Sequence, residues 1–306
     1  MGDADPAPGA AILGVRHSRP ACTVPALACD CHVHVFGPAG RFPYAPGRAY
    51  TPGDASIAEL QALHRALGIE RVVIVQASPF GSDNACTLDA LRRIGPCARG
   101  VAVIDANTTD AQLAGMHTAG VRGVRVNLET AGQHDPAAAR RMLAEAAARV
   151  APLGWHVQVF TSLAVITSLH DAILALPTTL VIDHFGRAPA ALGAGGPGFD
   201  VLLSLVAIGK VYVKLSAPHR VSQALDCVDV APLARALIAA NPERMVWGSD
   251  WPHPGATPGV TRRPDVIEAF TPVDDGRALN RLDEWAGNAA TLEKILMHNP
   301  ARLYDF

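Results

Sequence analysis

The chain has 306 residues, of which 49% are hydrophobic, so it is long enough and apolar enough to build one large core. Its net charge of −2 at pH 7 provides no excess of positive charge for binding nucleic acid or an anionic membrane surface. No run of 18 apolar residues occurs, which predicts that no segment spans a membrane.

Residues 1–24 contain early acidic residues and prolines, whereas a secretory signal has a basic and then an apolar stretch. We therefore expect a flexible N-terminal arm over residues 1–24, one catalytic domain over residues 25–306, and a cytoplasmic location. The 6 cysteines form no CxxC pair, and in the cytoplasm they are most simply free thiols.

Short β-branched runs alternate with Ala- and Leu-rich stretches through the rest of the chain. The apolar runs predict eight strands, over residues 26–36, 71–78, 98–105, 120–128, 155–160, 179–185, 211–217 and 244–250. The stretches between and after them predict helices over residues 56–68, 109–120, 135–150, 162–176, 198–209, 230–242 and 288–304. Ser56 with Glu59 forms the pattern of a capping box, and Asp135 before Pro136 marks another helix start.

Alternation of helices with strands that are apolar throughout indicates a parallel sheet covered by helices. Eight such units in 306 residues indicate an α/β fold, the (β/α)8 TIM barrel. A doubly wound nucleotide-binding sheet fits less well, because no Gly-rich phosphate fingerprint follows the first strand. Three connections rich in Gly and Pro, residues 36–55, 185–198 and 251–277, are predicted to form lid-like loops at the carboxyl ends of strands.

The first strand ends in the sequence CDCHVHVF, residues 29–36. Residues two apart share one face of a strand, so Asp30, His32 and His34 are predicted to point into the barrel together. Cys29 and Cys31 are then predicted to face the opposite way. Asp30, which lies deeper in the barrel, is expected to support the two histidines rather than to act as a catalyst.

The same alternation selects further polar side chains on the inner face of later strands, namely Arg125, Asn127, His156, Gln158, His184, Lys214, Ser216 and Asp250. A single strand histidine is more often structural than catalytic, and His156, early in its strand, is expected to be structural. Lys214 is expected to form an ion pair rather than a Schiff base. Arg122, whose parity opposes that of Arg125, is expected to face a helix or form a salt bridge.

His32, His34, His184 and Asp250 are predicted to meet at the mouth of the barrel, because each falls at the carboxyl end of a predicted strand. Four ionisable groups converging in this way are improbable by chance, so we interpret them as a functional centre. The HxH pair suits either a shared metal ion or a shared oxygen atom, and both alternatives remain open at this point.

Three motifs carry a family resemblance: DCHVHVF at residues 30–36, DHFGR at 183–187 and WGSDWPH at 247–253. In this order they resemble the amidohydrolase superfamily, and within it the lactonase branch that contains the 2-pyrone-4,6-dicarboxylate hydrolases. The resemblance extends from about residue 26 to the end of the chain. It implies an amidohydrolase-like TIM barrel that opens a carboxylated, pyrone- or muconolactone-like lactone in aromatic compound catabolism.

The resemblance also implies residue roles. Asp250 would take a proton from water and pass it to the leaving oxygen, while His32, His34 and His184 would hydrogen-bond the lactone carbonyl. Substrate contacts are implied for Tyr50, Ser78, Arg125 and Arg220, with the two arginines binding a carboxylate.

Two departures from the family pattern concern the substrate pocket. The arginine that the family carries shortly after the fourth strand is absent from residues 127–136. The fifth strand offers Gln158 where a further pocket residue, for example an aromatic one, is expected. These departures are compatible with a lactone that carries one carboxylate rather than two.

Members of the wider superfamily often bind zinc through the HxH pair, a fifth-strand histidine and the eighth-strand aspartate. A binuclear site is not expected here, because the fourth strand has no bridging lysine and Glu129 lies beyond its end. We predict that no metal or other cofactor is required; if zinc is bound, its ligands would be His32, His34, His184 and Asp250.

Several alternatives remain beside the metal-independent lactonase. They are a zinc-dependent hydrolase or decarboxylase of the same superfamily, a sugar-acid lactonase, and a catalytically silent barrel that binds a small molecule. The expected partner is a small carboxylated lactone and neither nucleic acid nor membrane, with a homo-oligomer possible.

Overall fold

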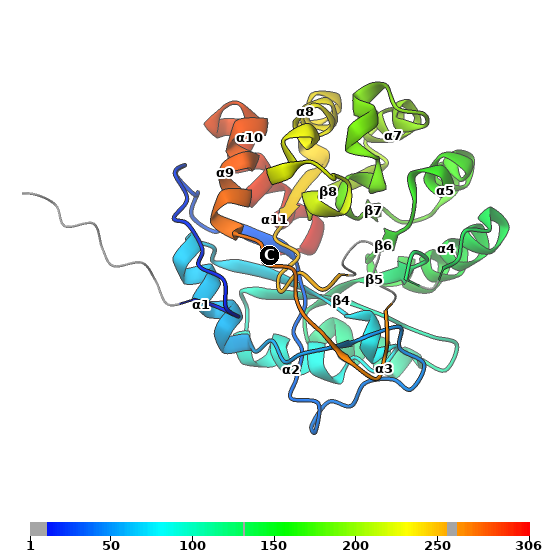
Figure 1. Cartoon of the computed structure of the whole chain (residues 1–306). Helices are drawn as coiled ribbons and strands as arrows, with labels where there is room; N and C mark the ends of the chain where they lie inside the picture. Colours follow the sequence, from blue (N-terminus) through cyan, green and yellow to red (C-terminus); the bar gives the residue numbers. More distant parts are fainter. Residues whose placement is uncertain (1–10, 131, 256–261) are drawn as a thin grey trace, which may run out of the picture.

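The computed structural model describes residues 11–130, 132–255 and 262–306. Eight parallel strands follow one another in chain order around a barrel, and helices surround them (Figure 1). The strands are β1 Cys29–Val33, β3 Arg71–Val75, β4 Ala98–Ala102, β5 Val121–Asn127, β6 His156–Phe160, β7 Leu180–Ile182, β8 Val211–Ser216 and β9 Met245–Gly248. The predicted (β/α)8 barrel is therefore confirmed.

The barrel closes through hydrogen bonds between the first strand and the segment that follows the last one. The backbone N–H of Asp250 donates to the carbonyl of His32 over 2.8 Å, and the N–H of His34 donates to the carbonyl of Trp251 over 2.8 Å. The seam of the barrel thus runs directly beside the residues predicted to be catalytic.

The helices are α1 Ile57–Leu67, α2 Ala85–Ile94, α3 Asp110–Thr118, α4 Pro136–Val150, α5 Leu163–Ser168, α6 His170–Ala175, α7 Phe199–Ala207, α8 Ala231–Ala240, α9 Asp275–Ala286, α10 Ala289–Glu293 and α11 Asn299–Tyr304. The predicted capping box of Ser56 and Glu59 is confirmed, and Asp135 caps α4. The helix predicted over 162–176 breaks at Leu169, and α2 and α9 were not predicted. Within the described ranges, no helix is both long and apolar enough to cross a membrane.

The predicted facing of β1 is wrong for its first residues. Cys29 and Cys31 lie in the interior cluster of the barrel, packed with Val73, Val75, Val101, Val181, Tyr212, Val246 and Tyr304. The register explains the error: Asp30 is opposite Val72 and Val33 is opposite Ile74, so β1 uses one more residue than β3 between the same two points. This β-bulge inverts the alternation of side chains, and it lets the cysteines and the following histidines face the same interior.

Asp30 consequently points away from the interior and supports the site through the backbone. Its carboxylate accepts hydrogen bonds from the backbone N–H of His32 over 3.2 Å and of Ser249 over 2.9 Å. It also accepts the hydroxyl of Ser249 over 2.5 Å and lies 3.4 Å from Nε2 of His64 on α1. Asp30 therefore holds the bulge of β1 against the turn that carries Asp250, but it does not contact either histidine ring predicted to need it.

The loops over the mouth are joined to one another. Strand β2, Thr51–Pro52, lies in the first long connection and pairs in parallel with β10, Ile267–Glu268, in the last. Residues 185–198, predicted to form a lid-like loop rather than a helix, contain short 3₁₀ turns. Residues 256–261 of the third predicted loop lie outside the described residues.

The described part of the predicted N-terminal arm contacts helix α9. The backbone N–H and the hydroxyl of Ser18 donate to the carboxylate of Asp274 over 2.9 and 2.5 Å, and the N–H of Ala21 donates to Asn280 over 2.6 Å. Residues 1–10 of the predicted arm lie outside the described residues.

Candidate active site

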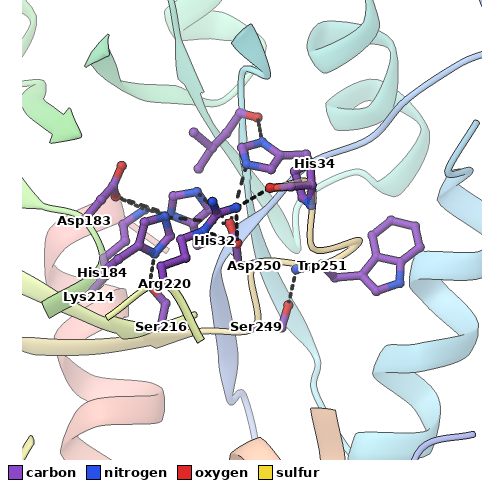
Figure 2. Close-up of polar contacts among 12 residues, drawn as sticks. His32, His34, Asp183, His184, Lys214, Ser216, Arg220, Ser249, Asp250 and Trp251 are labelled. Carbon is purple, nitrogen blue, oxygen red and sulfur yellow. Dashed lines mark hydrogen bonds and ion pairs between the residues drawn. The ribbon is translucent and has the colours of Figure 1, made fainter. Parts of the chain in front are cut away.

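The four residues predicted to form the functional centre lie together at the mouth of the barrel (Figure 2). One oxygen of Asp250, Oδ1, lies 3.6 Å from Nε2 of His32, 3.7 Å from Nε2 of His34 and 3.8 Å from Nε2 of His184. All four side chains are buried. Three imidazoles therefore converge on one carboxylate oxygen, as the sequence predicted, although the HxH pair at β1, His184 after β7 and Asp250 after β9 are far apart in the chain.

Local backbone geometry aims these side chains. His184 and Asp250 have φ values of 49° and 70°, in the left-handed region that residues other than glycine seldom adopt. Gly248 permits the backbone of β1 to approach β9, because a Cβ at this position would lie 2.6 Å from Cβ of His32. His32 is therefore placed by the absence of a side chain on the neighbouring strand.

Burial sets the charge state of the histidines. It lowers the pKa of His34 to about 3, and it lowers the pKa of His32 and of His184 well below the ordinary histidine value. The rings are therefore neutral near pH 7, and each carries one N–H. In His34 the Nδ1 atom lies 2.8 Å from the carbonyl oxygen of Val75, which can only accept. The hydrogen is therefore on Nδ1, and Nε2 presents a lone pair to the site.

Asp250 is held on one side and unpartnered on the other. Both Nε and Nη2 of Arg220 donate to Oδ2, over 2.9 and 2.7 Å. Oδ1 has no hydrogen-bond partner among the described residues, although it is buried. Burial raises the pKa of Asp250, and Arg220 opposes part of that rise. The carboxylate thus has one oxygen available to accept a proton.

An acidic residue that sequence reasoning missed lies beneath the histidines. Oδ2 of Asp183 accepts hydrogen bonds from Nη2 of Arg125 over 3.1 Å and from Nε2 of Gln158 over 3.1 Å, and its Oδ1 lies 3.3 Å from Nδ1 of His32. Although burial opposes ionisation, Arg125 and Lys214 hold the pKa of Asp183 below its ordinary value. Two features of the sequence could have predicted this role: Asp183 directly precedes His184, and Arg125 and Lys214 were predicted on the inner face of other strands, where an acidic partner is needed.

Lys214 completes this network as a structural cation. Its Nζ donates to the carbonyl of Cys31 and to Oε1 of Gln158, each over 2.8 Å, and lies 3.8 Å from Asp183 and 3.3 Å from Nδ1 of His32. Burial lowers the pKa of Lys214 to about 8. The lysine is engaged by fixed acceptors below the cavity, which agrees with the predicted ion pair and not with a Schiff-base role.

A cavity of about 890 Å³ opens above the four residues, and all four predicted substrate contacts line it: Tyr50, Ser78, Arg125 and Arg220. Gln158, expected in the pocket, lies instead below it, and the aromatic wall of this strand is Phe160. The guanidinium groups of Arg125 and Arg187 lie 5.2 and 5.7 Å from the centre of the Phe160 ring.

Two further arginines that sequence reasoning missed, Arg187 and Arg262, also line the cavity. Each of the four lining arginines is paired with a carboxylate; the pairs are Arg125–Asp183, Arg187–Glu129, Arg220–Asp250 and Arg262–Glu268. A negatively charged ligand entering the cavity would therefore meet guanidinium groups that already have partners. The cavity is suited to anions, which would compete with these carboxylates for the guanidinium groups.

Two polar residues of the strands have structural surroundings. His156 packs edge-on against Tyr304 at the closed end of the barrel, with the ring centres 5.2 Å apart, and its ring covers Gly123. Arg122 forms an ion pair with Asp305 over 3.2 Å. Both observations agree with the structural roles predicted for these residues.

The donor atoms fit a single divalent cation. Ligand atoms of His32, His34 and Asp250 lie within 4.8 Å of one another, and Nε2 of His32 and Oδ1 of Asp250 are buried without hydrogen-bond partners among the described residues. Ligands of a tetrahedral zinc ion lie about 3.4 Å apart, which is close to the separations found here. The imidazole and carboxylate groups present are thus able to hold zinc.

Comparison with known proteins gives consistent matches along nearly the whole chain. The amidohydrolase family profile matches residues 29–306. The chain is 40% identical over 298 residues to a 2-pyrone-4,6-dicarboxylate hydrolase of Comamonas testosteroni, covering 94% of this chain and 93% of that protein. It is 37% identical over 283 residues to a 4-sulfomuconolactone hydrolase of Rhizobium radiobacter, covering 92% and 91%. A ligand-free crystal structure from Agrobacterium tumefaciens superposes with a TM-score of 0.79 at 26% identity, covering 94% and 98%.

Proposed function

The chain belongs to the amidohydrolase family, and from this premise we propose that it hydrolyses a lactone that carries an acidic group. The observation that carries the proposal is the unpartnered oxygen of Asp250, which faces three neutral imidazoles at the floor of an arginine-lined cavity. Two relatives are named for hydrolysis of lactones with carboxylate or sulfonate groups, which fits arginines in the wall of the cavity.

Asp250 is the proposed general base and then the general acid. A water molecule attacks the lactone carbonyl carbon, and Oδ1 of Asp250 accepts one of its protons. The carbonyl oxygen becomes an oxyanion in the tetrahedral intermediate. The bond from the carbonyl carbon to the ring oxygen then breaks, and Asp250 returns the proton to that leaving oxygen. The products are one carboxylic acid and one hydroxyl group on the opened chain; the acid then releases the second proton of the attacking water to solvent and becomes a carboxylate, so atoms and charge balance.

The histidines have two different roles in this mechanism. Nδ1 of His184 lies 2.8 Å from the hydroxyl of Ser216, and Nδ1 of His32 lies 3.3 Å from Nζ of Lys214. If these neighbours donate to Nδ1, both rings carry their hydrogen on Nε2 and can stabilise the oxyanion. His34 cannot donate from Nε2, because its hydrogen is held by the carbonyl of Val75. We therefore assign His34 to accept a hydrogen bond from the attacking water, in place of the donor role that the family resemblance implied.

A zinc-dependent hydrolase is the second candidate, and the lone pair of His34 favours it. This lone pair faces Oδ1 of Asp250 at 3.7 Å, and two acceptors so placed need a proton donor or a cation between them. Zinc held by His32, His34, His184 and Asp250 would supply Lewis acidity for the carbonyl. Asp183 and Ser216 would then accept hydrogen bonds from Nδ1 of His32 and of His184 and orient both rings.

One experiment tests the proposed function and separates the alternatives. The purified protein is assayed for acid release with mono- and dicarboxylated pyrones, muconolactones, sugar lactones and an uncharged pyrone. Turnover should be highest with an acidic, unsaturated lactone. Preference for sugar lactones, or release of carbon dioxide without ring opening, would replace the proposal by the sugar-acid lactonase or the decarboxylase. Bound zinc is measured on the same preparation.

A further inference from the structure

Arg220 and the carboxylate assigned as the base, Asp250, both line the cavity, and Arg220 holds one side of that carboxylate. Arg220 lies in a short turn after β8, and its guanidinium donates twice to Oδ2 of Asp250 (Figure 2). The guanidinium also donates to the carbonyl of Pro254. The side chain of Arg220 is 16% exposed, whereas that of Asp250 is fully buried. An anion that enters the cavity therefore meets an exposed part of the guanidinium, whereas the side chain of Asp250 offers no exposed surface.

The ion pair makes Asp250 a weaker base than an unpaired carboxylate in the same place. A proton accepted at Oδ1 leaves the two hydrogen bonds to Oδ2 in place but removes the negative charge that strengthens them, in a buried, weakly screened environment. The other three arginines of the cavity do not impose this cost, because their partners are Asp183, Glu129 and Glu268. Arg220 alone among the lining arginines holds the residue to which the reaction gives a proton.

We propose that Arg220 is a clamp on Asp250 that the acidic group of the substrate opens. A carboxylate or sulfonate of the lactone draws the guanidinium away from Oδ2, and the freed Asp250 then activates water. This inference rests on the proposed lactone hydrolysis and deepens it. The acidic group of the substrate then raises turnover and not only affinity, and an uncharged lactone of equal reactivity is a slow substrate because it leaves the clamp closed.

The clamp is tested by supplying the lactone and the anion as two separate molecules. The uncharged pyrone is assayed at saturating concentration with increasing acetate, and sodium chloride keeps the ionic strength constant. Acetate should raise kcat on the order of tenfold and in a saturable manner, the effect expected when an opposing charge is withdrawn from a base. An absence of acetate activation, while the carboxylated lactone is turned over, overturns the clamp and leaves the proposed function standing.

The variant Arg220→Gln provides the second arm. It should turn over the uncharged lactone faster than the native enzyme, should no longer respond to acetate, and should lose the advantage of the carboxylated substrate in kcat. If the variant turned over the uncharged lactone more slowly than the native enzyme, Arg220 would be needed to hold Asp250 in place. If the rate were unchanged, Arg220 would only bind the substrate. Either result overturns the clamp.

Control variants and a folding measurement separate the test of the clamp from misfolding of the variant and from failure of the proposed function. Arg93→Gln removes an exposed arginine of α2 and should change neither reaction. Thermal unfolding of Arg220→Gln shows whether the variant is folded, and Arg220→Lys should restore part of the acetate response if charge is the operative feature. If the native protein turns over no lactone at all, the proposed function itself fails, and the clamp fails with it.

Discussion

Nε2 of His34 faces Oδ1 of Asp250 across 3.7 Å, while Nδ1 of the same ring lies 2.8 Å from the carbonyl of Val75. The backbone of β3 thereby determines which nitrogen of the His34 imidazole carries the hydrogen. The ring can accept a hydrogen bond at the reaction centre or coordinate a cation there, and it can do neither if Nε2 is protonated.

The first prediction follows from the assigned role of Asp250. Asp250→Asn removes the proton acceptor but keeps the shape, so kcat should fall by a factor on the order of 10³ while KM changes little. Steady-state kinetics with the best lactone of the panel would measure this. Asp265→Asn, which changes an exposed carboxylate, is the matched control. Near-native turnover by the Asp250 variant would remove it from the mechanism.

The second prediction concerns metal. On the metal-independent mechanism, the enzyme should keep its activity after dialysis against a chelator, and elemental analysis should find less than one zinc per chain. Activity that disappears on chelation and returns with one equivalent of zinc would decide for the zinc-dependent candidate, with the same four side chains as ligands.

The third prediction separates binding from stability at Arg125. Arg125→Ala should raise KM sharply, and it should also lower the free energy of unfolding by about 3–5 kcal/mol, because it leaves the buried charge of Asp183 without its main partner. The double variant Arg125→Ala/Asp183→Asn should regain much of the lost free energy of unfolding, whereas its KM should stay as high as that of the single variant. An unchanged KM in the single variant would exclude Arg125 from the substrate site.

The fourth prediction uses a pair of glycines. Gly248→Ala should lower both the melting temperature and kcat, because its Cβ would lie 2.7 Å from the backbone nitrogen of His32. Gly115→Ala in α3 meets no atom within 4 Å, so it should raise the free energy of unfolding by about 0.5–1 kcal/mol and leave kcat unchanged. Thermal unfolding and kinetics on both variants would check this, and equal effects at the two sites would contradict the close approach.

The fifth prediction concerns the pH dependence of stability. Burial lowers the pKa of His156 from 6.5 to about 3, so below pH 6.5 the unfolded chain binds a proton that the folded chain does not. Stability is then lost as the pH falls from 6.5 toward 3, by up to about 1.4 kcal/mol per pH unit for this group. When the free energy of unfolding is measured by chemical denaturation between pH 4 and 7, it should depend less steeply on pH for His156→Leu than for the native chain. An identical slope would show that His156 does not contribute.

Sequence patterns predicted the barrel and the four central residues because both depend on repeated, local signals. Strand alternation and motif position predicted that His184 and Asp250 lie at the same end of the barrel as the HxH pair. The same alternation failed at Cys29 and Cys31, since one extra residue in β1 inverts the pattern and leaves no mark in composition. The extra residue of β1 is apparent only from its hydrogen-bonded register with β3.

The remaining omissions have physical causes as well. Helices α2 and α9 have no Ala- and Leu-rich stretch, but their apolar residues recur at helical spacing, and this periodicity is the signal that could have predicted them. Glu129 and Asp250, the partners of Arg187 and Arg220, lie just beyond strand ends, and Glu268, the partner of Arg262, lies in the two-residue strand β10; the course of these connections is set by tertiary contacts rather than by periodicity. The pairing of Arg220 with Asp250 could not be read from two residues thirty positions apart in such segments.

The seam of the barrel has a consequence for when the enzyme becomes competent. The hydrogen bonds between His32 and Asp250 and between His34 and Trp251 join the first strand to the segment after the last one. A growing chain on the ribosome cannot form them until nearly the whole polypeptide has emerged, so incomplete products contain the HxH pair but no assembled centre. A chain can therefore be active only after its translation is nearly complete and the barrel has closed between β1 and the segment after β9.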